Sequence, residues 1–199
     1  MNKNPKKLVF ASHNLGKYNE MSTLLTPHNI DLIFLGDHSK EDIEETGLSF
    51  HENALLKARK ASQLTGLPAL GDDSGLCVKA LNNRPGIYSA RYNGIGSSFE
   101  SKMLKLLDEL KSTDDREAFF ICVLAYVKQD NDPIPRFFEG LWHGSIANQI
   151  KGSHGFGYDP IFFDPELNMC VGEMSHDMKI ELSHRAKATK LFVNERLPL

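Results

Sequence analysis

A lysine near the start of a predicted helix is the first residue whose position suggests chemistry. It ends a short polar segment made up of Ser12, His13, Asn14, Leu15, Gly16 and Lys17. The N–H groups and positive dipole end of a helix N-terminus favour a bound phosphate, and a lysine there is mildly unfavourable unless an anion shares the site. Taken alone, the segment is more often a polar loop with a solvated lysine. It lacks the glycine spacing and the Ser/Thr of a Walker A loop, which disfavours an ordinary P-loop ATPase or kinase.

Two pairs of acidic residues follow along the chain. Glu44 and Glu45 precede a predicted helix, and Asp72 and Asp73 stand at a predicted strand end. Each pair has an ordinary structural explanation, because acids favour a helix start and Asp-Ser-Gly is good turn chemistry. Mg²⁺, however, prefers carboxylate oxygens and typically takes one or two of them together with substrate phosphates and water. Combined with a phosphate-binding loop, the acids would supply a metal site and a general base.

The C-terminal part of the chain carries a glycine-rich segment and further cations. Residues 155–160 read Gly-Phe-Gly-Tyr-Asp-Pro, so close backbone approach and stacking on an aromatic ring are possible, although a rigid surface turn is equally consistent. The segment is not the GxGxxG motif of dinucleotide-binding folds. Lys179 comes shortly before the predicted cap of the last helix, and His184 and Arg185 follow the cap, where positive charge opposes the helix dipole. An anionic ligand would explain this repeated placement of cations.

The elements that must position these residues alternate between strands and helices. Apolar runs predict strands at 7–11, 30–35, 69–75, 76–81, 117–128 and 136–147, with a tight turn at the end of the third and a short strand through Phe163. Periodic apolar residues predict helices at 17–25, 49–65, 97–111 and 183–196, and Ser-x-x-Glu capping boxes open the second and third. Because the central strands lack intervening helices, we expect one α/β domain over residues 1–199 with a mixed sheet.

Composition narrows the class of protein. The chain has 199 residues, of which 41% are hydrophobic and 25% charged, and its net charge is −3. No apolar run approaches the roughly 20 residues of a membrane span, and the N-terminal apolar stretch is too short for a signal peptide. The acidic balance argues against an RNA-binding module, which normally needs a basic face. Three widely spaced cysteines indicate neither a zinc site nor a disulfide framework. We therefore expect a cytoplasmic protein that binds neither nucleic acid nor a membrane.

Six separated motifs together resemble the inosine triphosphate pyrophosphatase family, and within it the bacterial dITP/XTP pyrophosphatases. The resemblance covers nearly the whole chain in order, which is far more specific than any one motif. The motifs are Ser12 to Lys17, Glu44 to Gly47 with Phe50 and Glu52 to Ala54, Asp72 to Leu76, Pro85 to Arg91, Gly155 to Pro160, and Ser183 to Arg185. One departure is His13, since bacterial members often have Thr-Gly-Asn at residues 12–14.

The resemblance implies an elongated α/β fold in which two lobes flank a nucleotide-binding cleft, assembled as a homodimer. It implies Mg²⁺-dependent hydrolysis of non-standard purine nucleoside triphosphates such as ITP, dITP and XTP to the monophosphate and pyrophosphate, before a polymerase uses them. Asp73 would be the general base, Lys17 would stabilise the transition state, and the metal would be held by Asp73 and an acid of the Glu44–Glu45 pair. The implied nucleotide contacts are Ser12, His13, Asn14, Leu15, Gly16, Lys17, Ser74, Phe156, Gly157, Tyr158, Asp159, Lys179, His184 and Arg185.

Base choice would depend on a donor aimed at the 6-keto oxygen of hypoxanthine or xanthine. Arg185 is the predicted donor, with His184 assisting and Phe156 stacking on the ring, because a buried donor left unpaired by adenine is costly. Other functions stay open: a related pyrophosphatase acting on modified pyrimidines or standard nucleotides, and a nucleotide sensor without turnover. The acids argue against the sensor, since a pure binder needs no base. The preference among ITP, dITP and XTP, the exclusion of GTP and the choice between Glu44 and Glu45 do not follow from the sequence.

Overall fold

The computed structural model describes residues 5–41 and 43–195, and over them the chain divides into two compact units. Unit 1 comprises residues 5–41, 43–73, 122–140 and 184–195, and unit 2 comprises residues 74–121 and 141–183. Strands β3 (Ala69–Val78), β5 (Glu117–Val127) and β6 (Arg136–Ile146) each contribute residues to both units. The predicted α/β class with a mixed sheet is confirmed. The grouping of residues 1–199 as one domain stays a prediction.

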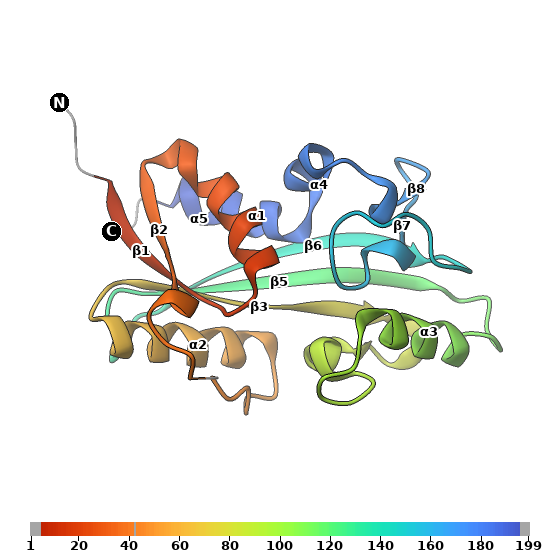
Figure 1. Cartoon of the computed structure of the whole chain (residues 1–199), viewed down its shortest axis with the longest axis horizontal. Helices are drawn as coiled ribbons and strands as arrows, with labels where there is room; N and C mark the ends of the chain where they lie inside the picture. The colour runs from red at the N-terminus through yellow and green to blue at the C-terminus, as the bar shows by residue number, and fades with distance from the viewer. Residues whose placement is uncertain (1–4, 42, 196–199) are drawn as a thin grey trace. The chain divides into compact units, whose positions relative to one another are not determined.

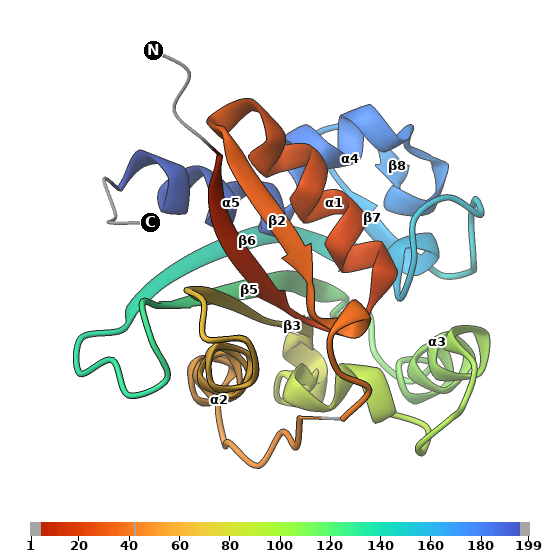
Figure 2. The same ribbon diagram turned by 60° about the vertical axis from the view of Figure 1, so that its left-hand side comes forward.

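Unit 1 is built on the strand order β2-β1-β3-β5-β6. Its further elements are β1 (Lys6–Ala11), α1 (Leu15–Leu25), η1 (Thr26–His28), β2 (Ile30–Phe34), η2 (Leu35–Asp37), α2 (Phe50–Thr65) and α5 (His184–Asn194). β1 pairs in parallel with β2 and with β3, as crossovers through α1 and α2 require. α1 and α5 cover one face of these strands and α2 covers the other (Figure 1). Figure 2 brings β1 and β2 forward, with α1 running beside β2.

Unit 2 extends the three shared strands with short antiparallel strands. β4 (Arg84–Pro85) pairs with β3, β7 (Phe162–Asp164) pairs with β6, and β8 (Met169–Cys170) pairs with β7. Its helices are η3 (Lys79–Leu81), η4 (Gly86–Arg91), α3 (Phe99–Glu109), η5 (Asp159–Ile161), η6 (Val171–Glu173) and α4 (His176–Leu182). Each unit has its own apolar core, around Phe10 and Met21 in unit 1 and around Leu106 and Phe162 in unit 2. Within the described residues, no helix is both long and apolar enough to cross a membrane.

The structure differs from the local predictions at four places. β3 runs without interruption to Val78, so the predicted turn after Asp73 is a strand, and residues 79–81 form η3 instead of strand. Both faces of β3 are largely buried, and this packing outweighs the turn preference of Asp-Ser-Gly. α3 is capped by Ser98 rather than Ser97, and α4 is a helix that the periodicity did not predict. Ser49 caps α2 as predicted, whereas the predicted end of the last helix at Arg196 lies outside the described residues.

Two glycines let helices of unit 1 lie directly against its strands. A Cβ on Gly71 of β3 would stand 2.0 Å from the Ala54 carbonyl oxygen of α2. A Cβ on Gly140 of β6 would stand 2.0 Å from the His184 carbonyl oxygen of α5. Any other residue at either position would push the helix away from the sheet. The side chains that α2 and α5 direct at β3 are therefore held at short range.

Candidate active site

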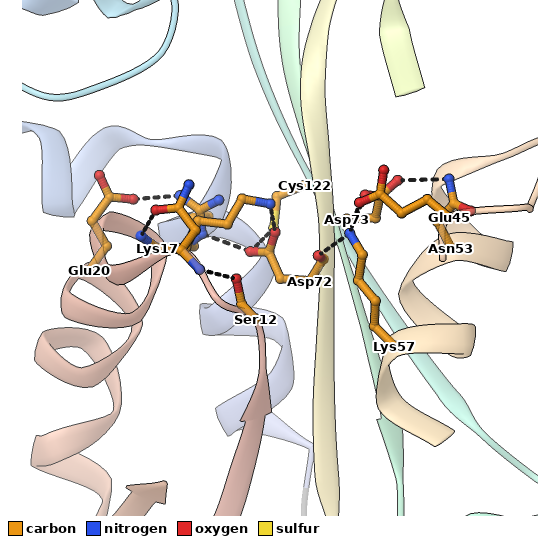
Figure 3. A network of polar contacts seen from close by, with 11 residues as sticks. Ser12, Lys17, Glu20, Glu45, Asn53, Lys57, Asp72, Asp73 and Cys122 are labelled. Atoms are coloured by element: carbon orange, nitrogen blue, oxygen red, sulfur yellow. Dashed lines mark hydrogen bonds and ion pairs between the residues drawn. The ribbon is translucent and has the colours of Figure 1, made fainter. Parts of the chain in front are cut away.

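Asp72 and Asp73 are neighbours on β3 but lie on opposite sides of the strand (Figure 3). Successive side chains of a strand alternate between its two faces, and both of these carboxylates are buried. Asp72 contacts residues of α1 and α5, whereas Asp73 contacts residues of α2. All of these contacts lie within unit 1. The strand thus separates two charged clusters that differ in partners and in chemistry.

The Asp72 carboxylate is held by two cations. Lys17 Nζ donates to its Oδ1 at 2.5 Å, and Arg185 Nε donates to its Oδ2 at 2.8 Å. The same guanidinium donates through Nη1 to Glu20 Oε2 at 2.5 Å, and the Cys122 thiol lies 3.5 Å from Asp72 Oδ2. Burial by itself would raise the pKa of Asp72, but Arg185 and then Lys17 outweigh it and hold that pKa well below its usual range. Asp72 is therefore an anion at neutral pH and a poor proton acceptor there.

The loop before α1 fixes the position of the Lys17 backbone. Asn14 caps the helix, and its side-chain oxygen accepts the backbone N–H of Lys17 at 3.2 Å. Ser12 Oγ in turn accepts the backbone N–H of Asn14 at 3.1 Å, and His13 Nε2 lies 2.8 Å from the Ser39 carbonyl oxygen. This confirms a loop that opens a helix. The phosphate contact proposed for it stays a prediction.

The Asp73 carboxylate faces Lys57, which was not among the site residues predicted from the sequence. Lys57 Nζ donates to Asp73 Oδ1 at 2.7 Å, to Glu45 Oε1 at 2.5 Å and to the Asp72 carbonyl oxygen at 3.2 Å, which uses all three of its N–H groups. Asn53, one helical turn before Lys57 on α2, donates to Asp73 Oδ2 at 3.4 Å. The ammonium therefore bridges two carboxylates, and α2 holds Asp73 by both oxygens (Figure 3).

The pKa of Asp73 moves in the direction opposite to that of Asp72. Burial raises it, the positive charges of Lys57 and Lys17 lower it, and Glu45 raises it further, with a net rise above the usual value. Burial lowers the pKa of Lys57, but Asp73 and Glu45 more than offset this, so Lys57 stays an ammonium. A carboxylate with a raised pKa is a better proton acceptor near neutral pH than an ordinary one. The raised pKa favours Asp73 over Asp72 as a proton acceptor, and its role as the general base stays a prediction.

The acids around Lys57 suit a divalent cation. Glu45 and Asp73 already direct oxygens at one positive centre, the Lys57 ammonium, whereas Glu44 is exposed. Mg²⁺ typically takes one or two carboxylates and completes its shell with substrate phosphates and water, so this donor set fits. Over residues 5–41 and 43–195, no three His, Cys, Asp or Glu side chains gather into a cage that would hold a metal without such help.

In unit 2, the glycine-rich segment is anchored through Asp159. Asp159 Oδ2 accepts the backbone N–H of Phe156 at 2.8 Å and the Lys179 ammonium at 2.6 Å. Lys179 Nζ also lies 4.2 Å from the centre of the Phe156 ring, within the range of a cation–π contact. A Cβ on Gly155 (φ +75°) would stand 2.0 Å from Asp159 Oδ2, so only glycine fits there. The half-buried Phe156 ring is thereby held in one orientation beside a cation.

The motif at residues 85–91 braces this same segment. Ser89 Oγ accepts the backbone N–H of Leu76 at 3.0 Å and donates to the Gly86 carbonyl oxygen at 2.6 Å. The Ser89 carbonyl oxygen accepts the hydroxyl of Tyr158 at 2.9 Å, and the Tyr158 ring packs edge-on against Phe99. Tyr158 is therefore a core residue that fixes the end of the segment.

The other predicted site residues are placed as follows. Leu15 is exposed at the start of α1, and Gly16 follows it in the same helix. Ser74 is half-buried on β3, in unit 2. His184 and Arg185 begin α5, and both are buried in unit 1, with 6% and 1% of their surfaces exposed. The contact of Arg185 with a base stays a prediction, and its Nε and Nη1 atoms are already paired with Asp72 and Glu20.

Four residues of these clusters were not among the predicted site residues, although Asn53 lies within the motif at Glu52 to Ala54: Glu20, Asn53, Lys57 and Cys122. One signal for Lys57 was available, because it stands beside Ala54, Ala58 and Ala61 on the inner face of a predicted helix, where a lysine needs a partner. The partners of Glu20 and Cys122 lie far away in sequence, and no local pattern indicates them.

Because the pKa of Asp72 is lowered in the folded protein, its ion pairs stabilise the fold above the unfolded-state value of about 3.9. That contribution is lost as the pH falls below about 4 towards the lower folded-state pKa. In urea unfolding at a series of pH values, Asp72→Asn should have a lower free energy of unfolding than the wild type at pH 7. Below about pH 4, its free energy of unfolding should also fall less steeply with decreasing pH, and this part of the curve is the acid limb. Asp108→Asn, which removes an exposed carboxylate paired with Lys111, should leave the limb unchanged. A wild-type acid limb in Asp72→Asn would contradict the assignment of Asp72 as a buried anion.

Comparison with known proteins agrees with this architecture. A protein of Pseudomonas syringae pv. tomato named dITP/XTP pyrophosphatase is 50% identical over 198 residues, covering 98% of this chain and 99% of its own. A protein of the same name from Yersinia pestis is 47% identical over 191 residues, covering 95% and 97% of the two chains. The solved structure of a HAM1 protein from Coxiella burnetii matches with a TM-score of 0.89 at 42% identity, over 95% of this chain and 97% of that one.

A further solved structure, named as a nucleoside-triphosphatase / dITP/XTP pyrophosphatase, comes from Mycobacterium abscessus and matches with a TM-score of 0.75 at 37% identity. It covers 96% of this chain and 98% of its own. The sequence profile of the Ham1 family matches residues 8–195, which include all the site residues described above. This chain belongs to the Ham1 family.

Proposed function

We propose that this chain is a Mg²⁺-dependent enzyme that hydrolyses non-standard purine nucleoside triphosphates such as ITP, dITP and XTP to the monophosphate and pyrophosphate. The observation that carries the proposal is the buried Asp73 carboxylate, whose pKa is raised and whose neighbouring lysine also reaches Glu45. The name dITP/XTP pyrophosphatase, carried by relatives that match nearly the whole chain, supports the substrate class. The reaction would remove these nucleotides before a polymerase incorporates them.

In the proposed reaction, Asp73 accepts a proton from a water molecule while the water oxygen attacks the α-phosphorus. The bond from the α-phosphorus to the bridging oxygen breaks, and pyrophosphate leaves. Lys57 and Asn53 fix the two carboxylate oxygens, so the acceptor is held in one place before substrate arrives. Asp73 afterwards gives its proton to solvent. No covalent intermediate is needed.

Lys17, the segment 12–16 and a metal ion would stabilise the negative charge of the phosphates. Lys17 Nζ and the backbone N–H groups at the start of α1 stabilise negative charge as it develops. Glu45 and Asp73 would hold Mg²⁺, which when bound offsets charge on the phosphate oxygens. We assign the metal to Glu45 rather than Glu44 because only Glu45 shares the Lys57 ammonium with Asp73.

We assign base recognition to Phe156, Gly157, Asp159 and Lys179. The Phe156 ring offers a stacking surface, and the Lys179 ammonium beside it is a donor suited to a keto oxygen. His184 and Arg185 remain predicted contacts, as does Ser74. The homodimer, the cleft between two lobes and the cytoplasmic location are likewise predictions of the resemblance.

The reaction is tested by product identification. With Mg²⁺, purified protein should convert dITP, ITP or XTP into the monophosphate and pyrophosphate, and ATP much more slowly. Anion-exchange chromatography separates these from the products of γ-cleavage, a diphosphate and orthophosphate. Release of orthophosphate and a diphosphate would contradict attack at the α-phosphorus. Equal turnover of ATP would contradict the substrate class.

The base is tested by Asp73→Asn. An amide keeps the shape of the side chain but cannot accept the proton, so kcat should fall roughly 10²- to 10⁴-fold. Glu44→Gln, which alters an exposed acid directly before Glu45, serves as the matched control and should keep wild-type kcat. Thermal unfolding of both variants checks that the fold is retained. Near-wild-type kcat in Asp73→Asn would remove Asp73 from the mechanism.

The metal assignment is tested by comparing Glu45→Gln with Glu44→Gln. Loss of a carboxylate ligand should raise the Mg²⁺ concentration needed for half-maximal activity at least tenfold in Glu45→Gln, on the order expected for metal-site substitutions. Glu44→Gln should match the wild type. A titration in which only Glu44→Gln shifts would reverse the assignment.

A further inference from the structure

The proposed reaction uses Lys17 but leaves two buried charges unexplained. Glu20 lies on the inner side of α1 with 4% of its surface exposed, and Arg185 lies in the first turn of α5. Glu20 belongs to neither the proposed general base nor the proposed metal site. Burying a carboxylate is costly unless it is paired, so its place in the core needs a reason.

The four side chains Lys17, Asp72, Arg185 and Glu20 form a continuous chain of charge, which we call the buried quartet. Lys17 Nζ lies 2.5 Å from Asp72 Oδ1, Arg185 Nε lies 2.8 Å from Asp72 Oδ2, and Arg185 Nη1 lies 2.5 Å from Glu20 Oε2. These ion pairs connect Lys17 on α1 to Asp72 on β3, Asp72 to Arg185 on α5, and Arg185 to Glu20 on α1. Lys17 and Glu20 stand three residues apart, so the chain of charge closes on one turn of that helix. Two cations and two anions alternate, and the charges balance.

This closed arrangement restricts Lys17 in a way that a single ion pair would not. A lysine side chain has four rotatable bonds, and ordering it costs conformational entropy. Asp72 holds the ammonium, and Asp72 is itself oriented by the planar guanidinium, whose other arm is held by Glu20. Arginine can do this because its donors form a rigid fork. The Lys17 side chain is the most exposed of the four at 14%, whereas the side chains of Glu20, Arg185 and Asp72 are 6%, 1% and 0% exposed.

We propose that Glu20 and Arg185 are positioning residues that act through Asp72 to hold the Lys17 ammonium where it meets the phosphates of the substrate. The inference rests on the proposed function for the identity of the ligand of Lys17. Glu20 and Asp72 thereby join the residues on which the rate of hydrolysis depends. The Arg185 side chain acquires a role within unit 1.

A double-mutant cycle separates positioning from simple stabilisation. Glu20→Gln keeps the shape of the side chain but removes its charge, so kcat/KM for dITP should fall roughly tenfold, since small misplacements of a catalytic group cost 10- to 100-fold. Lys17→Ala should lower kcat/KM further. In the double variant, the Glu20→Gln change should have no additional effect, because the group that it positions is gone. If Glu20 only stabilises the fold, the two losses will multiply, and the proposal is overturned.

Thr189→Val is the matched control for packing. Thr189 is buried on α5 one turn after Arg185, and its hydroxyl lies 3.4 Å from Met21 Sδ on α1, so it probes the same helix contact without a charge. This variant should keep wild-type kcat/KM whatever its melting temperature. If Thr189→Val and Glu20→Gln reduce kcat/KM equally, packing rather than charge is responsible.

A second measurement does not depend on turnover. The rate at which an amine-reactive acylating reagent modifies Lys17, followed by peptide mass spectrometry, should rise several-fold in Glu20→Gln, while labelling of the exposed Lys79 stays constant. If Glu20→Gln does not fold, Arg185→Lys, which keeps the charge but loses the fork, takes its place. An unchanged Lys17 labelling rate overturns the proposal. If wild-type protein hydrolyses no nucleotide, the proposed function fails, and the labelling rate alone decides whether the buried quartet restrains Lys17.

Discussion

A carboxylate sealed from water between an ammonium and a guanidinium determines much of unit 1. The Asp72 side chain is wholly buried, and an unpaired anion in that position would be very costly. Lys17 and Arg185 remove the cost only if α1 and α5 sit where their side chains reach β3. Such an arrangement adds little stability over an apolar core, but it allows few alternatives, because any shift of one partner leaves a charge unpaired. One aspartate therefore constrains the placement of the first and last helices of unit 1, together with the apolar core that both helices share.

The neighbouring aspartate shows how the same residue type acquires a different chemistry. Asp73 shares its strand, its burial and its sequence surroundings with Asp72, yet its pKa is raised where that of Asp72 is lowered. Burial raises the pKa of both carboxyl groups. Arg185 and Lys17 outweigh burial at Asp72, whereas at Asp73 the charges of Lys57, which is shared with Glu45, and of Lys17 do not. One strand thus presents a fixed anion on one face and a proton acceptor on the other. This division of labour is common where two carboxylates must do different work.

Much of this arrangement could be predicted from the sequence, and the exceptions have physical causes. The strands and helices around Lys17, the Ser49 cap and the separation of the motifs follow from local periodicity and capping. The strand nature of residues 72–75 does not, because Asp-Ser-Gly favours a turn and only the packing of both faces of β3 overrides it. The partners of Arg185 lie 113 and 165 residues away, at Asp72 and Glu20, so no window of sequence contains them. Glu45 became distinguishable from Glu44 only once Lys57 was placed.

The alternation of Asp72 and Asp73 on β3 also limits how the gene for this chain can change. Side chains of a strand exchange faces when the strand slips by one residue. Insertion or deletion of one residue in β3 before Asp72 would therefore turn Asp73 towards Arg185 and Asp72 towards α2. Gly71 would also no longer face the Ala54 carbonyl. Substitutions elsewhere in β3 alter one contact at a time, but a change of length would disturb both faces at once. Variation in length among related chains should thus be confined to loops outside this strand.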